Sequence, residues 1–160
     1  MAKKVKIKKT LVEQILSKAG ISHQGIQINA LEGELPQGYE RDQIFKTLAL
    51  LGDKTGPIIG IVPITQHLSE KKLAKISGNK KVSMIPQKDL EKTTGYIHGA
   101  NNPVGIRQKH NYPIFIDKIA LDLDQMIVSA GEVGHSIILA PQVLASFVKA
   151  DFADILEDSK

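Results

Sequence analysis

The chain has 160 residues, of which 42% are hydrophobic and 24% are charged, as is typical of a globular protein of one domain. It contains no cysteine, which excludes a disulfide framework and a thiol nucleophile and suits the reducing cytoplasm. The net charge of +4 favours anionic partners, nucleic acid first, and no apolar run reaches the roughly 20 residues that a membrane span needs.

Much of the positive charge falls in two groups of lysines. The N-terminal group comprises Lys3, Lys4, Lys6, Lys8 and Lys9, and the second comprises Lys71, Lys72, Lys75, Lys80 and Lys81. Each group is either a solvated charged face or part of a surface for a polyanion. Residues 1–9 are interpreted as a basic N-terminal extension.

The first periodic segment predicts an amphipathic helix over residues 10–19. Its apolar residues recur at spacings of three and four. Thr10 is the expected N-cap and forms a capping box with Glu13, and Gly20 ends the helix. A short strand is expected over 25–28, followed by a loop over 32–38.

Residues 43–51 and 57–62 predict two strands of a hairpin, joined by a turn that contains two glycines. Alternation places Lys46 on the same face as Ile44 and Leu48. A buried lysine needs a partner. Lys46 is therefore either an edge-strand residue whose stem reaches water or a cation that points into a pocket.

The rest of the chain alternates short strands with few helices. Helices are expected over 69–76, 87–92 and 141–149, and strands over 82–85, 113–116, 125–129 and 136–140. Phe152 and Ile155 are expected to pack the tail. This pattern predicts a mixed α/β fold in a single domain that spans residues 1–160.

The segment Gly95–Gly105 carries three glycines, two asparagines and a proline in eleven residues. Such residues favour a stiff, shaped loop with exposed amides, which suits a polar or anionic group. An ordinary surface turn is the alternative. The segment matches neither the dinucleotide fingerprint nor the Walker loop.

Three stretches, taken in order, resemble the YbaK/EbsC family of aminoacyl-tRNA editing domains. They are Phe45-Lys46-Thr47-Leu48, Thr94-Gly95-Tyr96 through Pro103-Val104-Gly105, and Val128-Ser129-Ala130-Gly131 before Gly134. The resemblance covers most of the chain from about Gln43 onward. It implies a six- or seven-stranded, partly barrel-like mixed sheet flanked by helices.

The resemblance also implies a function and a set of site residues. The expected activity is that of a trans-editing deacylase, which removes cysteine from mischarged tRNA(Pro). By resemblance the catalytic residues are Lys46, which contacts the substrate's 3′ end, Gly99, whose backbone lies at the ester, and Ser129. The expected substrate-binding residues are Thr47, Tyr96, Ala100, Asn102, Pro103 and Gly131. The lysines of the N-terminal extension are expected to contact tRNA phosphates.

The expected chemistry relies on positioning, because an aminoacyl ester is already activated. Amides near Gly99 and Ala100 are the candidate donors to the carbonyl oxygen. In the family the substrate's own thiol is thought to attack its carbonyl, so neither a metal nor a cofactor is expected. The expected partners are the 3′ acceptor end of a mischarged tRNA and prolyl-tRNA synthetase, with no membrane.

Two other functions remain open. The family usually has a double glycine at Gly99-Ala100, a serine at Asn102 and an aspartate at Ser136. These differences suggest a catalytically weakened module that binds tRNA or a synthetase. A regulatory role at the cell envelope is the third interpretation, and no residue supports it.

Overall fold

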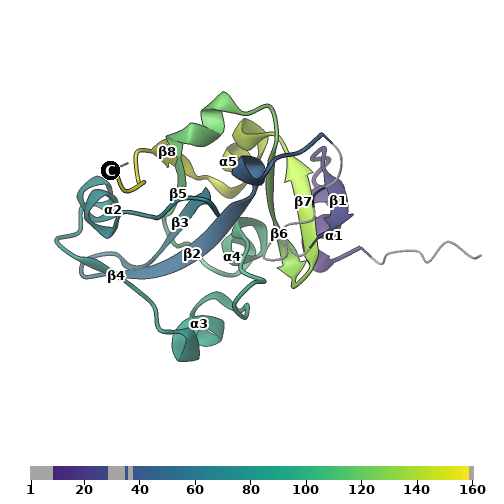
Figure 1. The fold of residues 1–160 in the computed structure, drawn as a ribbon. Coiled ribbons are helices and arrows are strands. Elements are labelled where there is room, and N and C mark those ends of the chain that lie inside the picture. The colour runs from purple at the N-terminus through teal and green to yellow at the C-terminus, as the bar shows by residue number, and fades with distance from the viewer. Residues whose placement is uncertain (1–8, 29–34, 36–37, 159–160) are drawn as a thin grey trace, which may run out of the picture.

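The computed structural model describes residues 9–28, 35 and 38–158 (Figure 1). The predicted mixed α/β class is confirmed: helices flank two sheets that are not closed into a barrel. The helices are α1 (Leu11–Lys18), α2 (Glu70–Ser77), α3 (Gln87–Thr94), α4 (Pro103–Lys109) and α5 (Pro141–Val148). The strands are β1 (Gln24–Gln27), β2 (Phe45–Gly52), β3 (Gly56–Pro63), β4 (Val82–Met84), β5 (Ile114–Asp117), β6 (Met126–Glu132), β7 (His135–Leu139) and β8 (Asp151–Ala153).

The larger sheet has the strand order β4-β2-β3-β5-β8. The hairpin predicted from the sequence is its centre, with β2 and β3 antiparallel over their full lengths. Strands β5 and β8 add to it in parallel. Alternation along β2 sends Phe45 and Ala49 into one core and Leu50 into another, so both faces of this sheet are covered.

The smaller sheet has the order β1-β7-β6 and lies with α1 at the side of the molecule away from α2 (Figure 1). A parallel bridge between Ile44 and Ile127 joins it to the larger sheet at the start of β2. Both isoleucines are buried in a small cluster with Ile28 and Ile138. The start of β2 and strand β6 therefore lie side by side where the two sheets meet.

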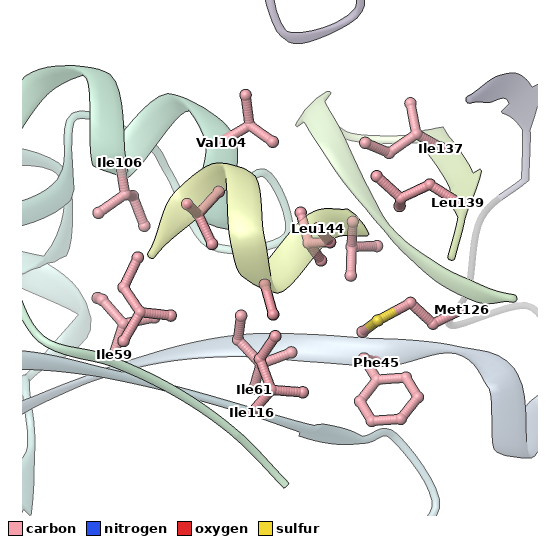
Figure 2. Close-up of a cluster of buried hydrophobic side chains, with 14 of the residues drawn as sticks. Phe45, Ile59, Ile61, Val104, Ile106, Ile116, Met126, Ile137, Leu139 and Leu144 are labelled. Atoms are coloured by element: carbon pink, nitrogen blue, oxygen red, sulfur yellow. The ribbon is translucent and has the colours of Figure 1, made fainter. Parts of the chain in front are cut away.

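The main core lies between the two sheets, where α4 and α5 fill the interior (Figure 2). It is aliphatic, as expected from a chain without tryptophan. Residues of β3, β5, β6 and β7 interdigitate with Val104 and Ile106 of α4 and Leu144 of α5. This close packing fixes the positions of the loops that leave the core.

The predicted helices and strands are observed with shifts of one to three residues at their ends. The capping box of Thr10 and Glu13 is present at α1, and Ser69 caps α2. Two elements were missed. Helix α4 begins at Pro103, inside the segment predicted as a loop up to Gly105, and β8 occupies part of the expected packed tail.

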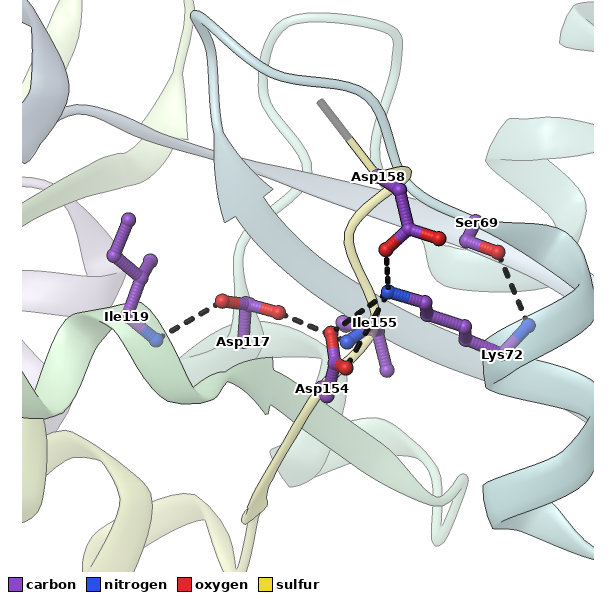
Figure 3. A network of polar contacts seen from close by, with 7 residues as sticks. All are labelled: Ser69, Lys72, Asp117, Ile119, Asp154, Ile155 and Asp158. Carbon is purple, nitrogen blue, oxygen red and sulfur yellow. Dashed lines mark hydrogen bonds and ion pairs between the residues drawn. The ribbon is translucent and has the colours of Figure 1, made fainter. Parts of the chain in front are cut away.

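The C-terminal segment is fastened to the larger sheet by a buried carboxylate (Figure 3). Asp117 is 2% exposed and accepts hydrogen bonds from the amides of Ile119 and Ile155, both at 2.9 Å. Lys72 of α2 forms ion pairs with Asp154 at 3.2 Å and with Asp158 at 2.8 Å. Together these contacts hold residues 154–158 against α2.

Replacing Asp117 by alanine should destabilise the fold by about 3 kcal/mol, because one buried and one half-buried amide lose a charged acceptor. Lys72→Ala should cause a much smaller loss, because its ion pairs are exposed to solvent. Urea denaturation of both variants measures the difference. Equal losses of unfolding free energy in the two variants would contradict the dominant role of the Asp117 carboxylate.

Candidate functional site

The loop that follows α3 is held rigid by buried polar side chains. Thr94 is fully buried and donates a hydrogen bond to Asn101 Oδ1 at 2.7 Å. Its hydroxyl oxygen also accepts a hydrogen bond from the amide of Tyr96 at 3.1 Å. The expectation of a stiff loop is therefore met between Gly95 and Asn102.

Asn102 closes this loop and starts α4. Its side chain is fully buried: Oδ1 accepts from the Gly105 amide at 2.6 Å, and Nδ2 donates to the Ala100 carbonyl at 3.1 Å. Pro103, the first residue of α4, is also buried. The structure thus places both residues in the interior, where they shape the loop beneath its exposed tip.

Gly99 forms the exposed tip of the loop, with a φ of +88° that favours glycine. Its amide donates no hydrogen bond within the described part of the chain. The amide of Ala100, in contrast, donates to the Ile97 carbonyl at 3.0 Å, and the Ala100 side chain is buried. Of the two candidate donor amides, that of Ala100 is therefore engaged within the loop, whereas that of Gly99 has no acceptor among the described residues.

Ser129 lies on β6 beside this tip. Its hydroxyl oxygen accepts a hydrogen bond from the Gly131 amide at 3.1 Å and makes a long contact of 3.5 Å with the Gly99 carbonyl. A bulge follows in β6, between Ser129 and Glu132. The structure thus brings together two of the three residues that were expected to be catalytic.

Ser136 is an additional residue of this region. It is paired directly with Ser129 across β6 and β7, and its other neighbour is Ile26 on β1. Cross-strand partners project from the same face of a sheet. Sequence reasoning noted Ser136 only as a difference from the family, because the pairing register of β6 and β7 cannot be read from spacing.

The bridge between the two sheets relates the position of Lys46 to that of Ser129. Ile44 and Ile127 face each other in parallel register. Two residues further along each strand come Lys46 and Ser129, so both project from the face of the bridge residues. This face is the one predicted for Lys46 from the alternation along its strand.

The ammonium group of Lys46 makes no ion pair within the described residues. Burial lowers its pKa below the ordinary lysine value. The side chain lines an open cavity of about 720 Å³ that extends away from the junction toward α2. Lys46 is therefore a partly desolvated cation between the Ser129 region and this cavity.

Two of the expected binding residues, Thr47 and Tyr96, pack against the interior of the protein. Thr47 lies on the same face of β2 as Phe45 and Ala49 and points toward the main core, away from Lys46. The Thr47 hydroxyl is buried and has no hydrogen-bond partner among the described residues. Tyr96 packs against Gly131 and Gly105, with Lys109 Nζ 4.7 Å from its ring centroid. Tyr96 therefore packs between the start of α4 and the bulge of β6 that follows Ser129.

The N-terminal extension falls mostly outside the described residues. Of its lysines, only Lys9 is described; it is exposed and lies 3.4 Å from Ser17 Oγ. Within residues 9–28, 35 and 38–158, no cluster of three or more histidine or acidic side chains forms a metal-binding arrangement. In the same residues no helix has the length and hydrophobicity to cross a membrane.

Comparisons with known proteins agree on one family. Residues 33–147 match the model of the aminoacyl-tRNA editing domain. An Enterococcus faecalis protein named "Putative Cys-tRNA(Pro)/Cys-tRNA(Cys) deacylase EbsC" is 47% identical over 118 residues, which are 74% of this chain and 71% of that protein.

Solved structures show the same fold at low identity. A crystal structure described as "a putative trans-editing enzyme for prolyl tRNA synthetase" is 23% identical, has a TM-score of 0.78 and is matched over 92% of this chain and 95% of its own. A hypothetical protein is 21% identical with a TM-score of 0.81, over 91% and 99% of the two chains. At these identities the likeness concerns the fold alone.

Three glycines around the site should differ in their tolerance of alanine. All have a positive φ, which costs a residue with a side chain about 1 kcal/mol or more. A Cβ at Gly134 would meet no atom within 4 Å and one at Gly99 would lie 3.5 Å from Val133, but one at Gly131 would lie 3.0 Å from Val12. Urea denaturation should therefore show the largest loss in free energy of unfolding for Gly131→Ala. A larger loss for Gly134→Ala would contradict the crowding at Gly131.

Proposed function

The chain belongs to the aminoacyl-tRNA editing domain family, and from that premise we propose that it is a trans-editing deacylase whose substrate is Cys-tRNA(Pro). The observation that carries this proposal is the meeting of Gly99 and Ser129 beside the strand junction that positions Lys46. The activity is proposed for the cytoplasm, and the chain is proposed to act as a single editing domain.

In this proposal Lys46 binds the phosphate that precedes the terminal adenosine. A lysine binds phosphate as a compact point charge. The partial burial of Lys46 strengthens this attraction, because the effective dielectric constant is lower there than in water. The contact fixes where the terminal ribose, and with it the ester, comes to lie.

Gly99 and Ser129 then face the reacting ester. The amide of Gly99, which donates no hydrogen bond among the described residues, is suited to stabilise the negative charge that develops on the carbonyl oxygen. The Gly99 carbonyl and the Ser129 hydroxyl, whose mutual contact is long, remain able to accept hydrogen bonds from the substrate's α-ammonium group. These contacts orient the amino acid without supplying a nucleophile.

The nucleophile in this proposal is the substrate's own sulfur. The cysteine thiol attacks the carbonyl carbon, the bond from that carbon to the ribose oxygen breaks, and the thiol proton passes to the ribose. The products are a thiolactone and a tRNA with a free terminal hydroxyl. The absence of cysteine from the whole chain is compatible with this route.

The resemblance also supports prolyl-tRNA synthetase as a partner that releases the mischarged tRNA. Co-sedimentation of the protein with that synthetase, with and without tRNA(Pro), tests this part of the proposal. A complex that survives in both conditions is expected, and free sedimentation in both would contradict it.

A catalytically weakened tRNA-binding module is the second candidate. The observation that favours it is the register of Ser136, which places a neutral hydroxyl opposite Ser129 where the family usually has a carboxylate. This candidate predicts salt-sensitive tRNA binding without turnover. Measurable release of cysteine would eliminate it.

Lys46→Met should lower kcat/KM for Cys-tRNA(Pro) by about a hundredfold, because the ester loses its alignment. Lys54→Ala, at the exposed end of the same hairpin, is the matched control and should retain activity. Full activity of Lys46→Met on every mischarged tRNA would refute the role of Lys46.

The same variant should not lose stability at pH 7. Folding disfavours the protonated form of Lys46, because its pKa in the folded state lies below that in the unfolded state. The contribution of Lys46 to the free energy of unfolding therefore rises as the pH increases through its folded-state pKa. We expect an equal or higher Tm for Lys46→Met, and a clear drop would indicate that the ammonium group supports the fold.

Replacing the substrate thiol by a hydroxyl distinguishes cyclisation from hydrolysis. Ser-tRNA(Pro) should be cleaved far more slowly than Cys-tRNA(Pro), since a hydroxyl is a weaker nucleophile than a thiol near neutral pH. Deacylation rates of the two substrates, with mass spectrometry of the first product, provide the measurement. Equal rates would show that water attacks the ester.

A further inference from the structure

The cavity beside Lys46 has no role in the chemistry described above. It lies between β2, the start of α2, the end of β4 and the C-terminal segment. Its volume of about 720 Å³ is within the range of known ligand sites. Ser129 and Gly99 are not among its lining residues, so the cavity extends from Lys46 away from the ester.

One wall of the cavity is apolar. Leu48 follows Lys46 on the same face of β2, and Met84 of β4 is paired with Leu50, which also shares that face. Met84 is 46% exposed although it lies within a hollow of the surface. An exposed, polarisable methionine offers a flat partner such as a nucleobase a favourable contact.

The rest of the lining includes charges of both signs. Lys71 is exposed and lines the cavity with Glu70 and Glu157. Glu157 is fixed in place because its amide donates to the His67 carbonyl at 2.8 Å, next to the bridge between Leu68 and Leu156. Carboxylates repel phosphate, so the cavity is not a simple phosphate track. They do accept hydrogen bonds from the exocyclic amine of cytosine.

We propose that this cavity binds the two cytidines that precede the terminal adenosine of the tRNA. The inference rests on the proposed function, in which Lys46 binds the phosphate between these cytidines and the adenosine. Met84 and Leu48 then contact a base, Lys71 contacts a second phosphate, and the carboxylates of Glu70 and Glu157 accept the cytosine amines. The enzyme thereby recognises the single-stranded end common to tRNAs.

Binding of short RNA tests the proposal independently of catalysis. A fluorescent single-stranded RNA that ends in CCA is titrated at several salt concentrations, with the same RNA ending in UUA as comparison. We expect tighter binding of CCA, by about tenfold for one well-placed base contact. Glu70→Ala combined with Glu157→Ala should remove this preference.

Lys71 and Lys75 form a matched pair one turn apart on α2, both exposed, of which only Lys71 lines the cavity. Lys71→Ala should reduce the slope of log K against log salt by about 0.7, the value for one phosphate of a single strand. Lys75→Ala should leave it unchanged. Equal slopes for the two variants, or equal binding of CCA and UUA by the wild type, would overturn the proposal.

Deacylation separates this inference from the proposed function. Met84→Asp should slow cleavage of Cys-tRNA(Pro) but not of the cysteinyl ester of adenosine alone, which lacks the cytidines. Equal slowing on both substrates would overturn the cavity assignment. A wild type that binds CCA selectively but cleaves neither substrate would refute the deacylase and leave the cavity assignment supported.

Discussion

The parallel bridge between Ile44 and Ile127 is the contact on which the candidate site depends. It is buried, and within the described residues it is the β-bridge that joins the two sheets. Because side chains alternate along a strand, this one contact determines that Lys46 and Ser129 emerge on the same face. A shift of one residue in either strand would turn one of them into the core.

The candidate site also requires a loop that exposes the Gly99 amide while the rest of its backbone is held by hydrogen bonds. Thr94 and Asn102 satisfy the backbone beneath the tip, and both are fully buried. The packing of Tyr96 against Gly105 and Gly131 ties the loop to the bulge of β6. The site is thus organised before any substrate binds, as positioning catalysis requires.

The sequence predicted most of the fold, because seven strands and four helices are marked by apolar runs, hydrophobic periodicity, capping residues or flanking glycines and prolines. Helix α4 was missed because Gly105 lies in its first turns, although Asn102 followed by Pro103 is a helix-start signal. Strand β8 was missed because it has three residues and depends on a distant parallel partner. The face of Lys46 follows from alternation, whereas the pairing of Ser136 and the engaged amide of Ala100 depend on tertiary register.

The fastening of the C-terminal segment by Asp117 and Lys72 has a consequence for biosynthesis. Residues 151–158 are made after every element that they contact, and Glu157 and the strand bridge at Leu156 complete one wall of the cavity. A nascent chain from which residues 151–158 have not yet emerged would lack that wall. Any capture of tRNA through the proposed cavity would then have to wait until this segment has left the ribosome and folded against α2.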